Sequence, residues 1–148
     1  MTVREEIEYV LTSWALGFDE RDLQRMVDAF TEDASMEIDI AGVETKGPFV
    51  GRDAVIKDMT DHQELEKYQT RHVVTNAVID PRGDDEADVT SYLTLFVIDD
   101  NVTSLQATGV YRDRFVRVEG RWRIARRDLY LDAHYLPPDY LAEEHAEA

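Results

Sequence analysis

His72 is the residue whose type and position most clearly suggest chemistry, and it begins the β-prone run of residues 71–79. An imidazole changes its protonation state near neutral pH and can move a proton without a metal. Successive side chains of a strand point to opposite faces, so His72 shares one face with Val74 and Asn76. That face is either a core with a hydrogen-bonded histidine or the wall of a pocket.

Two further positions could act together with His72. Asp19 lies near the connection between two predicted helices, where it either caps the second helix or orients a catalytic group. Arg126 and Arg127 are adjacent on the last predicted strand, so one of them faces inward. An inward guanidinium needs an anionic partner, which is either an internal carboxylate or a substrate.

Composition and motifs exclude several other kinds of chemistry. The 148 residues contain no Cys, which excludes a disulfide scaffold and a thiolate-bound metal. The formal net charge of −16 opposes phosphate backbones and anionic lipids, so we expect no nucleic-acid partner and no membrane partner. Because nucleotide-binding glycine motifs, zinc-type histidine spacing and nucleophile elbows are missing, we predict no cofactor and no metal. Without an apolar run of about 18 residues or a signal-peptide pattern, we expect a cytoplasmic protein.

Helices are predicted at the start of the chain. Apolar residues repeat at helical spacing within residues 7–18 and 23–30, and Thr2 and Glu5 have the spacing of a capping box. A third helix is predicted at about residues 53–65. On this helix His62 is expected to be solvated, because acidic residues surround it.

Strands are predicted for most of the remaining chain. A short strand at residues 35–40 precedes residues 41–52, which we expect to form a loop because they contain three glycines and a proline. Long alternating strands, joined by short turns that favour antiparallel pairing, are predicted at residues 71–79, 87–98, 104–118 and 121–132.

Helices followed by a long antiparallel sheet predict an α+β fold with helices on one sheet face. Strands of this length must bend, and a bent sheet closed by helices forms a cone whose apolar lining suits a small molecule. We expect one domain over residues 1–136. The acidic residues 137–148 follow two prolines and are expected to form a tail, which contains His145, with His134 just before it.

Short motifs follow one another in a specific order, namely Phe18-Asp19-Glu20-Arg21, Phe30-Thr31-Glu32-Asp33-Ala34, Phe49-Val50-Gly51-Arg52-Asp53-Ala54, Arg71-His72-Val73-Val74-Thr75-Asn76, Gly109-Val110-Tyr111-Arg112-Asp113 and Gly120-Arg121-Trp122-Arg123-Ile124. This order resembles the SnoaL-like branch of the nuclear-transport-factor-2-like superfamily over about residues 3–132. Its most similar group contains scytalone dehydratase, bile acid 7-alpha-dehydratase, hexachlorocyclohexane dehydrochlorinase and ring-hydroxylating dioxygenase beta subunits. The resemblance implies a cone-shaped α+β barrel in which a strongly bent, mixed and mainly antiparallel sheet wraps around N-terminal helices. It also implies a deep apolar pocket and a homo-oligomer, either a dimer or a trimer.

The resemblance also implies roles for particular residues. In the lyases of this group an Asp after the first helix and a His on the first long strand form a catalytic pair, and these positions match Asp19 and His72. We therefore expect their side chains to hydrogen-bond inside the cavity. The dehydrochlorinase has an Arg that matches Arg127, which could stabilise a departing anion or an enolate.

Trp14 departs from this pattern, because the dehydratases have a Tyr and the dehydrochlorinase a Lys at its position. An indole N–H can donate a hydrogen bond but cannot protonate a departing hydroxide. Elimination, isomerisation, cyclisation and simple binding therefore all stay open, with three tyrosines as alternative sources of a hydroxyl. The predicted pocket wall consists of Trp14, Phe18, Met59, Tyr68, Tyr92 and Tyr111.

Two functions are compatible with these residues. The first is a cofactor-independent lyase, isomerase or cyclase that removes a proton from a small, largely apolar substrate of polyketide, steroid or aromatic type. His72 would be its base, Asp19 the partner that orients the base, and Arg127 the group that stabilises the anion. The alternative is a non-catalytic subunit of the same fold, which binds a small molecule or serves assembly like a dioxygenase beta subunit.

Overall fold

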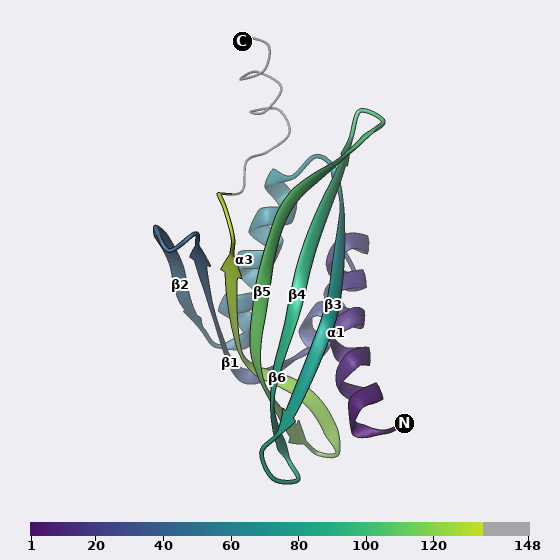
Figure 1. Cartoon of the computed structure of the whole chain (residues 1–148), viewed down its shortest axis with the longest axis vertical. Helices are drawn as coiled ribbons and strands as arrows, with labels where there is room; N and C mark the ends of the chain where they lie inside the picture. Colours follow the sequence, from purple (N-terminus) through teal and green to yellow (C-terminus); the bar gives the residue numbers. More distant parts are fainter. Residues whose placement is uncertain (135–148) are drawn as a thin grey trace.

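In the computed structural model, which describes residues 1–134, helices pack on one face of a six-stranded sheet (Figure 1). The helices are α1 (Val3–Glu20), α2 (Leu23–Asp28) and α3 (Arg52–Leu65). The strands are β1 (Phe30–Ile40), β2 (Glu44–Val50), β3 (Gln69–Pro81), β4 (Glu86–Asp99), β5 (Val102–Val118) and β6 (Arg121–Leu131). This arrangement confirms the predicted α+β class. The acidic tail predicted at residues 137–148 lies outside the described residues.

The start of α1 is the predicted capping box. The Thr2 hydroxyl accepts a hydrogen bond from the Glu5 backbone N–H at 3.1 Å, and the Glu5 carboxylate accepts one from the Thr2 backbone N–H at 3.0 Å. The short helix α2 is capped by Asp22, whose carboxylate accepts from the Arg25 backbone N–H at 3.3 Å. Because Asp22 caps α2, the Asp19 carboxylate is available for other contacts.

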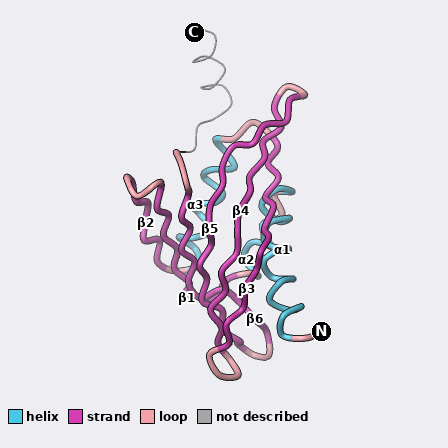
Figure 2. Tube along the Cα trace, in the orientation of Figure 1, coloured by secondary structure: helices cyan, strands magenta, loops and turns pink. Residues whose placement is uncertain are grey.

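The sheet is mixed, with the strand order β2-β1-β6-β5-β4-β3. Among the strands within residues 1–134, β1 and β6 alone pair parallel, and the other neighbouring strands run antiparallel. The long strands β4 and β5, of 14 and 17 residues, curve along their length (Figure 2). Register shifts interrupt β3–β4, β4–β5 and β5–β6, and such bulges increase the local bend and twist.

The segment predicted as a loop at residues 41–52 contains β2, so that prediction is wrong. This strand pairs antiparallel with β1 at the edge of the sheet, where Ile38 lies opposite Lys46. An edge strand tolerates Pro48, because one side of its backbone needs no partner strand. Gly47 and Pro48 therefore lie in an edge strand, whereas Gly42 and Gly51 lie in the turns that flank it.

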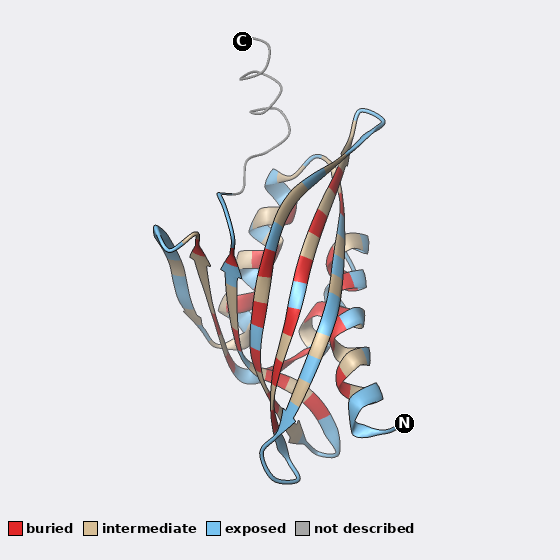
Figure 3. Cartoon of the chain, viewed as in Figure 1, coloured by how far each residue is buried: buried red, intermediate tan, exposed pale blue. Residues whose placement is uncertain are grey.

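The helix-facing side of the sheet and the apolar side of α1 form one core. Buried and less buried residues alternate along β4 and β5 (Figure 3), as expected for strands with one covered face. Leu11, Phe30, Val55, Phe115 and Ile124 are among the most deeply buried side chains. None of the helices within residues 1–134 is long and apolar enough to cross a membrane.

Candidate active site

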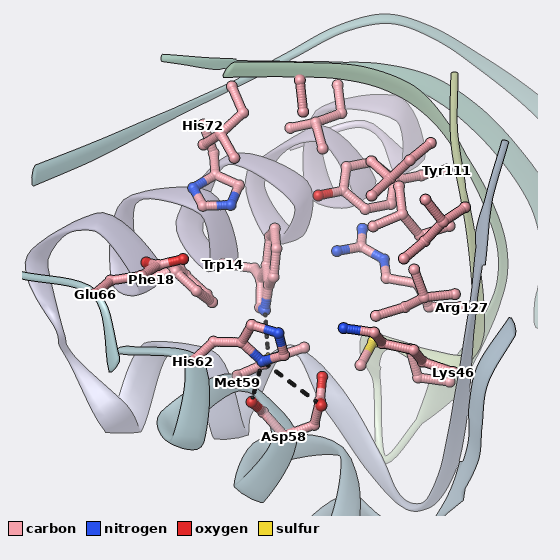
Figure 4. Close-up of a pocket in the computed structure, with 18 residues that line it drawn as sticks. Trp14, Phe18, Lys46, Asp58, Met59, His62, Glu66, His72, Tyr111 and Arg127 are labelled. Carbon is pink, nitrogen blue, oxygen red and sulfur yellow. Dashed lines mark hydrogen bonds and ion pairs between the residues drawn. The ribbon is translucent and has the colours of Figure 1, made fainter. Parts of the chain in front are cut away.

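A cavity of about 150 Å³ lies between the inner face of the sheet and helices α1 and α3 (Figure 4). Most of the residues around it are apolar. The polar residues that line it are Lys46, Asp58, His62, Glu66, His72, Tyr111 and Arg127. An engineered apolar cavity of about 150 Å³ binds benzene, so this cavity has room for about one six-membered ring.

His72 lies on the wall of the cavity and its ring is held by Asp19, in the last turn of α1. The His72 Nδ1–H donates to the Asp19 carboxylate at 2.6 Å, which is the hydrogen bond expected between these two side chains. The same carboxylate accepts from the His72 backbone N–H at 2.8 Å and from the Thr70 hydroxyl at 2.9 Å. Only 8% of the His72 side chain and 7% of the Asp19 side chain are exposed.

These contacts determine which ring nitrogen of His72 is available. A carboxylate can only accept, so Nδ1 carries a proton, and in the neutral ring Nε2 has the free lone pair. Figure 4 shows the other ring nitrogen of His72 directed into the cavity. This is the geometry that a general base and an orienting carboxylate would require.

Aromatic side chains fix the position of the His72 ring. The Phe18 ring lies 4.6 Å from it between centroids, and Trp14 packs edge-on against it at 5.5 Å. The Trp14 indole N–H donates to the Met59 sulfur at 3.4 Å, so this group is already engaged. Trp14, Phe18 and Met59 all line the cavity, and Trp14 serves there as a packing surface.

Arg127 is the inward-facing member of the arginine pair, and its partner is an internal carboxylate, one of the two alternatives left open by the sequence, which did not identify Asp113. Its Nε and Nη2 donate to the two oxygens of Asp113 at 2.9 and 3.0 Å. Its Nη1 is buried and has no hydrogen-bond partner among the described residues. Burial raises the pKa of the Asp113 carboxyl, and the positive charge of Arg127 opposes this effect. The neighbouring Arg126 faces outward, where its guanidinium pairs with Asp128.

Tyr111 lies directly beside Arg127. The guanidinium carbon of Arg127 is 4.0 Å from the centre of the Tyr111 ring and 4.5 Å from that of Trp14, so it is placed between two aromatic faces. The Tyr111 hydroxyl is directed toward the cavity (Figure 4). Burial raises the pKa of this hydroxyl well above its ordinary value, so the group stays protonated and can donate a hydrogen bond.

Tyr111 lines the cavity, whereas Tyr68 and Tyr92 do not, which corrects the predicted pocket wall. Tyr92 is 51% exposed on the outer face of β4, because Leu93 and Leu95 occupy the inward positions of that strand. Tyr68 lies just before β3 and is only partly buried.

A second polar cluster borders the cavity and was not predicted. His62 was expected to be solvated, but its side chain lines the cavity with 40% of its surface exposed. The His62 Nδ1–H donates to the Asp58 backbone carbonyl at 2.7 Å, and the Asp58 carboxylate lies 3.6 Å from the same nitrogen. Burial raises the pKa of Asp58, and the charges of His62 and Lys46 partly offset this rise. The spacing of Asp58, Met59 and His62 on one helical face was the available signal.

The described residues contain no group of three or more His, Asp or Glu side chains close enough together to hold a metal ion. Two imidazoles line the cavity from opposite sides, His72 on β3 and His62 on α3.

Several solved structures share this fold. A protein from Catenulispora acidiphila in complex with S-DNPA is 23% identical with a TM-score of 0.76, covering 88% of this chain and 93% of that chain. A scytalone dehydratase-like protein from Novosphingobium aromaticivorans is 23% identical with a TM-score of 0.70, covering 90% of this chain and 89% of that chain. The beta subunit of an aromatic-ring-hydroxylating dioxygenase-like protein from the same organism is 18% identical with a TM-score of 0.74, covering 90% of this chain and 91% of that chain. At these identities the likeness shows the fold.

The family of this chain is identified from its sequence. No curated protein matches this chain. The model of the SnoaL-like domain matches residues 1–128, which span all three helices and nearly all of the sheet. The chain therefore belongs to the SnoaL-like domain family.

Proposed function

We propose that this protein is a cofactor-independent enzyme of the lyase, isomerase or cyclase type, which removes a proton from a small, largely apolar substrate. The observation that carries this proposal is the 2.6 Å hydrogen bond between Asp19 and His72, which leaves the other His72 nitrogen directed into an apolar cavity. His72 is the base, and the Asp19 carboxylate orients its ring and stabilises the imidazolium that forms.

Two donors on the far side of the cavity support the same reaction. Removing a proton next to a carbonyl places negative charge on the carbonyl oxygen, and donors aimed at that oxygen lower the barrier. The Tyr111 hydroxyl and the unpartnered Nη1 of Arg127 are suited to this role, since both groups lie at the cavity. The Arg127 charge is held in place by Asp113, so little reorganisation is needed when the oxyanion forms.

The size of the cavity narrows the substrate class. About 150 Å³ accommodates one six-membered ring, whereas a four-ring steroid exceeds this volume. We therefore propose a substrate with a single ring next to a ketone, of aromatic or polyketide type, whose remaining part extends through the opening of the cavity.

The test is exchange of the α-protons of cyclohexanone in heavy water, followed by NMR. We expect the protein to accelerate exchange and Ala107→Phe, which fills the cavity from β5, to abolish the acceleration. Leu105→Phe, at an exposed position of the same strand, is the control and should behave as the wild type. Binding of the ketone without exchange would reject the enzyme and support the alternative function, a non-catalytic subunit of this fold.

We also propose that the protein is a homo-oligomer that assembles through the outer face of the sheet. Tyr92 on β4 lies opposite Val110 on β5, and Val110 lies opposite Tyr130 on β6. Tyr92 and Tyr130 are 51% and 38% exposed, so an apolar stripe crosses the strands on the side away from the helices. A second copy of the chain would present the same stripe, as a two-fold interface requires.

The oligomer is tested by light scattering. Tyr92→Glu should dissociate it to the monomer, because a charge in the middle of the stripe would be buried without a partner. Tyr9→Glu adds the same charge at an equally exposed tyrosine of α1 and should leave the mass unchanged. A monomeric wild type, or an unchanged mass for Tyr92→Glu, would reject the proposed interface.

A further inference from the structure

His62 is a second imidazole that borders the same cavity as His72. Its Nδ1–H donates to the Asp58 backbone carbonyl at 2.7 Å, and a carbonyl can only accept. This contact fixes the orientation of the ring and leaves its other nitrogen directed toward the cavity (Figure 4). The two histidines come from different elements, His72 from β3 and His62 from α3, with Trp14 between them in this view.

Charged side chains lie around His62 at the cavity. The Asp58 carboxylate lies 3.6 Å from Nδ1, with only 14% of the Asp58 side chain exposed. At this distance the carboxylate can serve as the counterion of the protonated ring that an acid requires. Lys46 from β2, Arg127 from β6 and Glu66 after α3 also line the cavity, so charges of both signs face it.

The groups that could otherwise protonate a departing oxygen are poorly suited to do so. The Trp14 indole N–H can donate a hydrogen bond but cannot protonate a departing oxygen, and it is engaged by the Met59 sulfur. Burial raises the pKa of Tyr111, which makes its hydroxyl a weaker acid although it remains a good hydrogen-bond donor. An imidazolium is a much stronger acid than either group.

We propose that His62 is a catalytic acid and that the reaction of this pocket is the elimination of water from a one-ring β-hydroxy ketone. This inference rests on the proposed function of His72 as the base. His62 lies at the partly exposed end of the cavity, with 40% of its side chain accessible, so a water molecule formed there can leave to solvent.

The proton and electron balance of the step is simple. The His72 Nε2 takes a proton from the carbon between the carbonyl and the C–O bond, and the electron pair of the C–H bond forms the new C=C bond. The C–O bond breaks and its electron pair stays on oxygen, which takes the proton from the His62 imidazolium and leaves as water. His72 gains one proton and His62 loses one, and exchange with solvent restores both rings.

Two probes separate this inference from the proposal on which it rests. Cyclohexanone has no leaving group, so its α-proton exchange reports only on His72. 3-Hydroxycyclohexanone can lose water to give cyclohex-2-enone, which is followed by its ultraviolet absorbance. We expect His62→Gln to lower the rate of elimination by about 10²–10⁴-fold, the usual contribution of a positioned acid, while the exchange of cyclohexanone continues.

Two further variants make the result specific. Lys57→Gln, on the same helix but paired with Asp61 at the surface, should retain both reactions. Because His62 is partly exposed, His62→Ala leaves space open to solvent, and added imidazole should restore part of the elimination. A structural role for His62 would not produce this rescue.

Each result decides one of the two proposals. If the wild type does not accelerate the exchange of cyclohexanone, proton abstraction by His72 is wrong. If the wild type exchanges cyclohexanone but does not form cyclohex-2-enone, or if His62→Gln eliminates water at the wild-type rate, the inference about His62 is wrong. Equal loss of exchange and elimination in His62→Gln would also overturn it, since the residue would then act by supporting the site as a whole.

Discussion

His72→Ala is expected to lower the rate of α-proton exchange by about 10²–10⁴-fold. The change removes the imidazole that Asp19 orients through Nδ1, and with it the Nε2 that faces the cavity. The affinity for the ketone should change little, since Phe18 and Trp14 still line the cavity. The measurement is the exchange rate at saturating ketone, together with the dissociation constant from an NMR titration.

Asp19→Asn distinguishes a pair that acts as a unit from two independent residues. The asparagine can present its NH₂ group to the His72 Nδ1, which favours the tautomer whose proton is on Nε2 and so blocks the base. We expect the exchange rate to fall with little change in affinity. The double variant should be scarcely slower than His72→Ala, because groups that act together are not additive. Independent losses that multiply in the double variant would contradict the proposed pair.

The parts of the fold that were predicted correctly depend on local patterns. The capping box at Thr2 and Glu5 begins α1, and strict alternation gives β4 and β5 with an inward face. Such patterns are set by neighbours within one or two turns or along a single strand, so they can be read without knowing the tertiary structure. The same local reasoning correctly placed His72 on a strand, whereas its contact with Asp19 was expected from the family resemblance.

The residues that were missed depend on long-range pairing. Lys46 reaches the cavity because β2 pairs with β1, although Gly47 and Pro48 in β2 are residue types typical of a loop. His62 was judged by its acidic neighbours in sequence, but the face that it shares with Met59 turns it toward the cavity. Tyr92 was assigned to the wrong face, because its orientation depends on the parity of the whole strand and not on its residue type.

The Arg127–Asp113 pair shows most clearly why register limits sequence analysis. The tight turn places Val118 opposite Arg121, and an unbroken antiparallel register from there would set Arg112 opposite Arg127. A register shift between Arg114 and Phe115 moves Asp113 to that position instead. A single inserted residue thus replaces a like-charge contact with the ion pair that holds Arg127 at the cavity.

Asp113→Asn is expected to lower the free energy of unfolding by about 3–5 kcal/mol, because it leaves the Arg127 charge buried without a counterion. The Arg127 side chain is 1% exposed and that of Asp113 is fully buried, so water cannot replace the lost carboxylate. Urea denaturation measures this loss. Asp128→Asn is the matched control. It breaks the same type of ion pair, between Asp128 and Arg126, but in this pair both side chains are about half exposed. That change should cost less than about 1 kcal/mol.

Replacing both partners with apolar residues separates the structural role of this ion pair from its role at the cavity. Arg127→Met combined with Asp113→Leu removes both buried charges and should recover most of the stability lost in Asp113→Asn. The oxyanion donor Nη1 disappears with Arg127, so the exchange of cyclohexanone should stay well below the wild-type rate even when the protein is stable. A stable double variant with wild-type exchange would show that the pair serves folding alone. If Asp113→Asn is as stable as the Asp128→Asn control, the Arg127 guanidinium needs no counterion. The proposal that Asp113 fixes the Arg127 charge at the cavity would then be wrong.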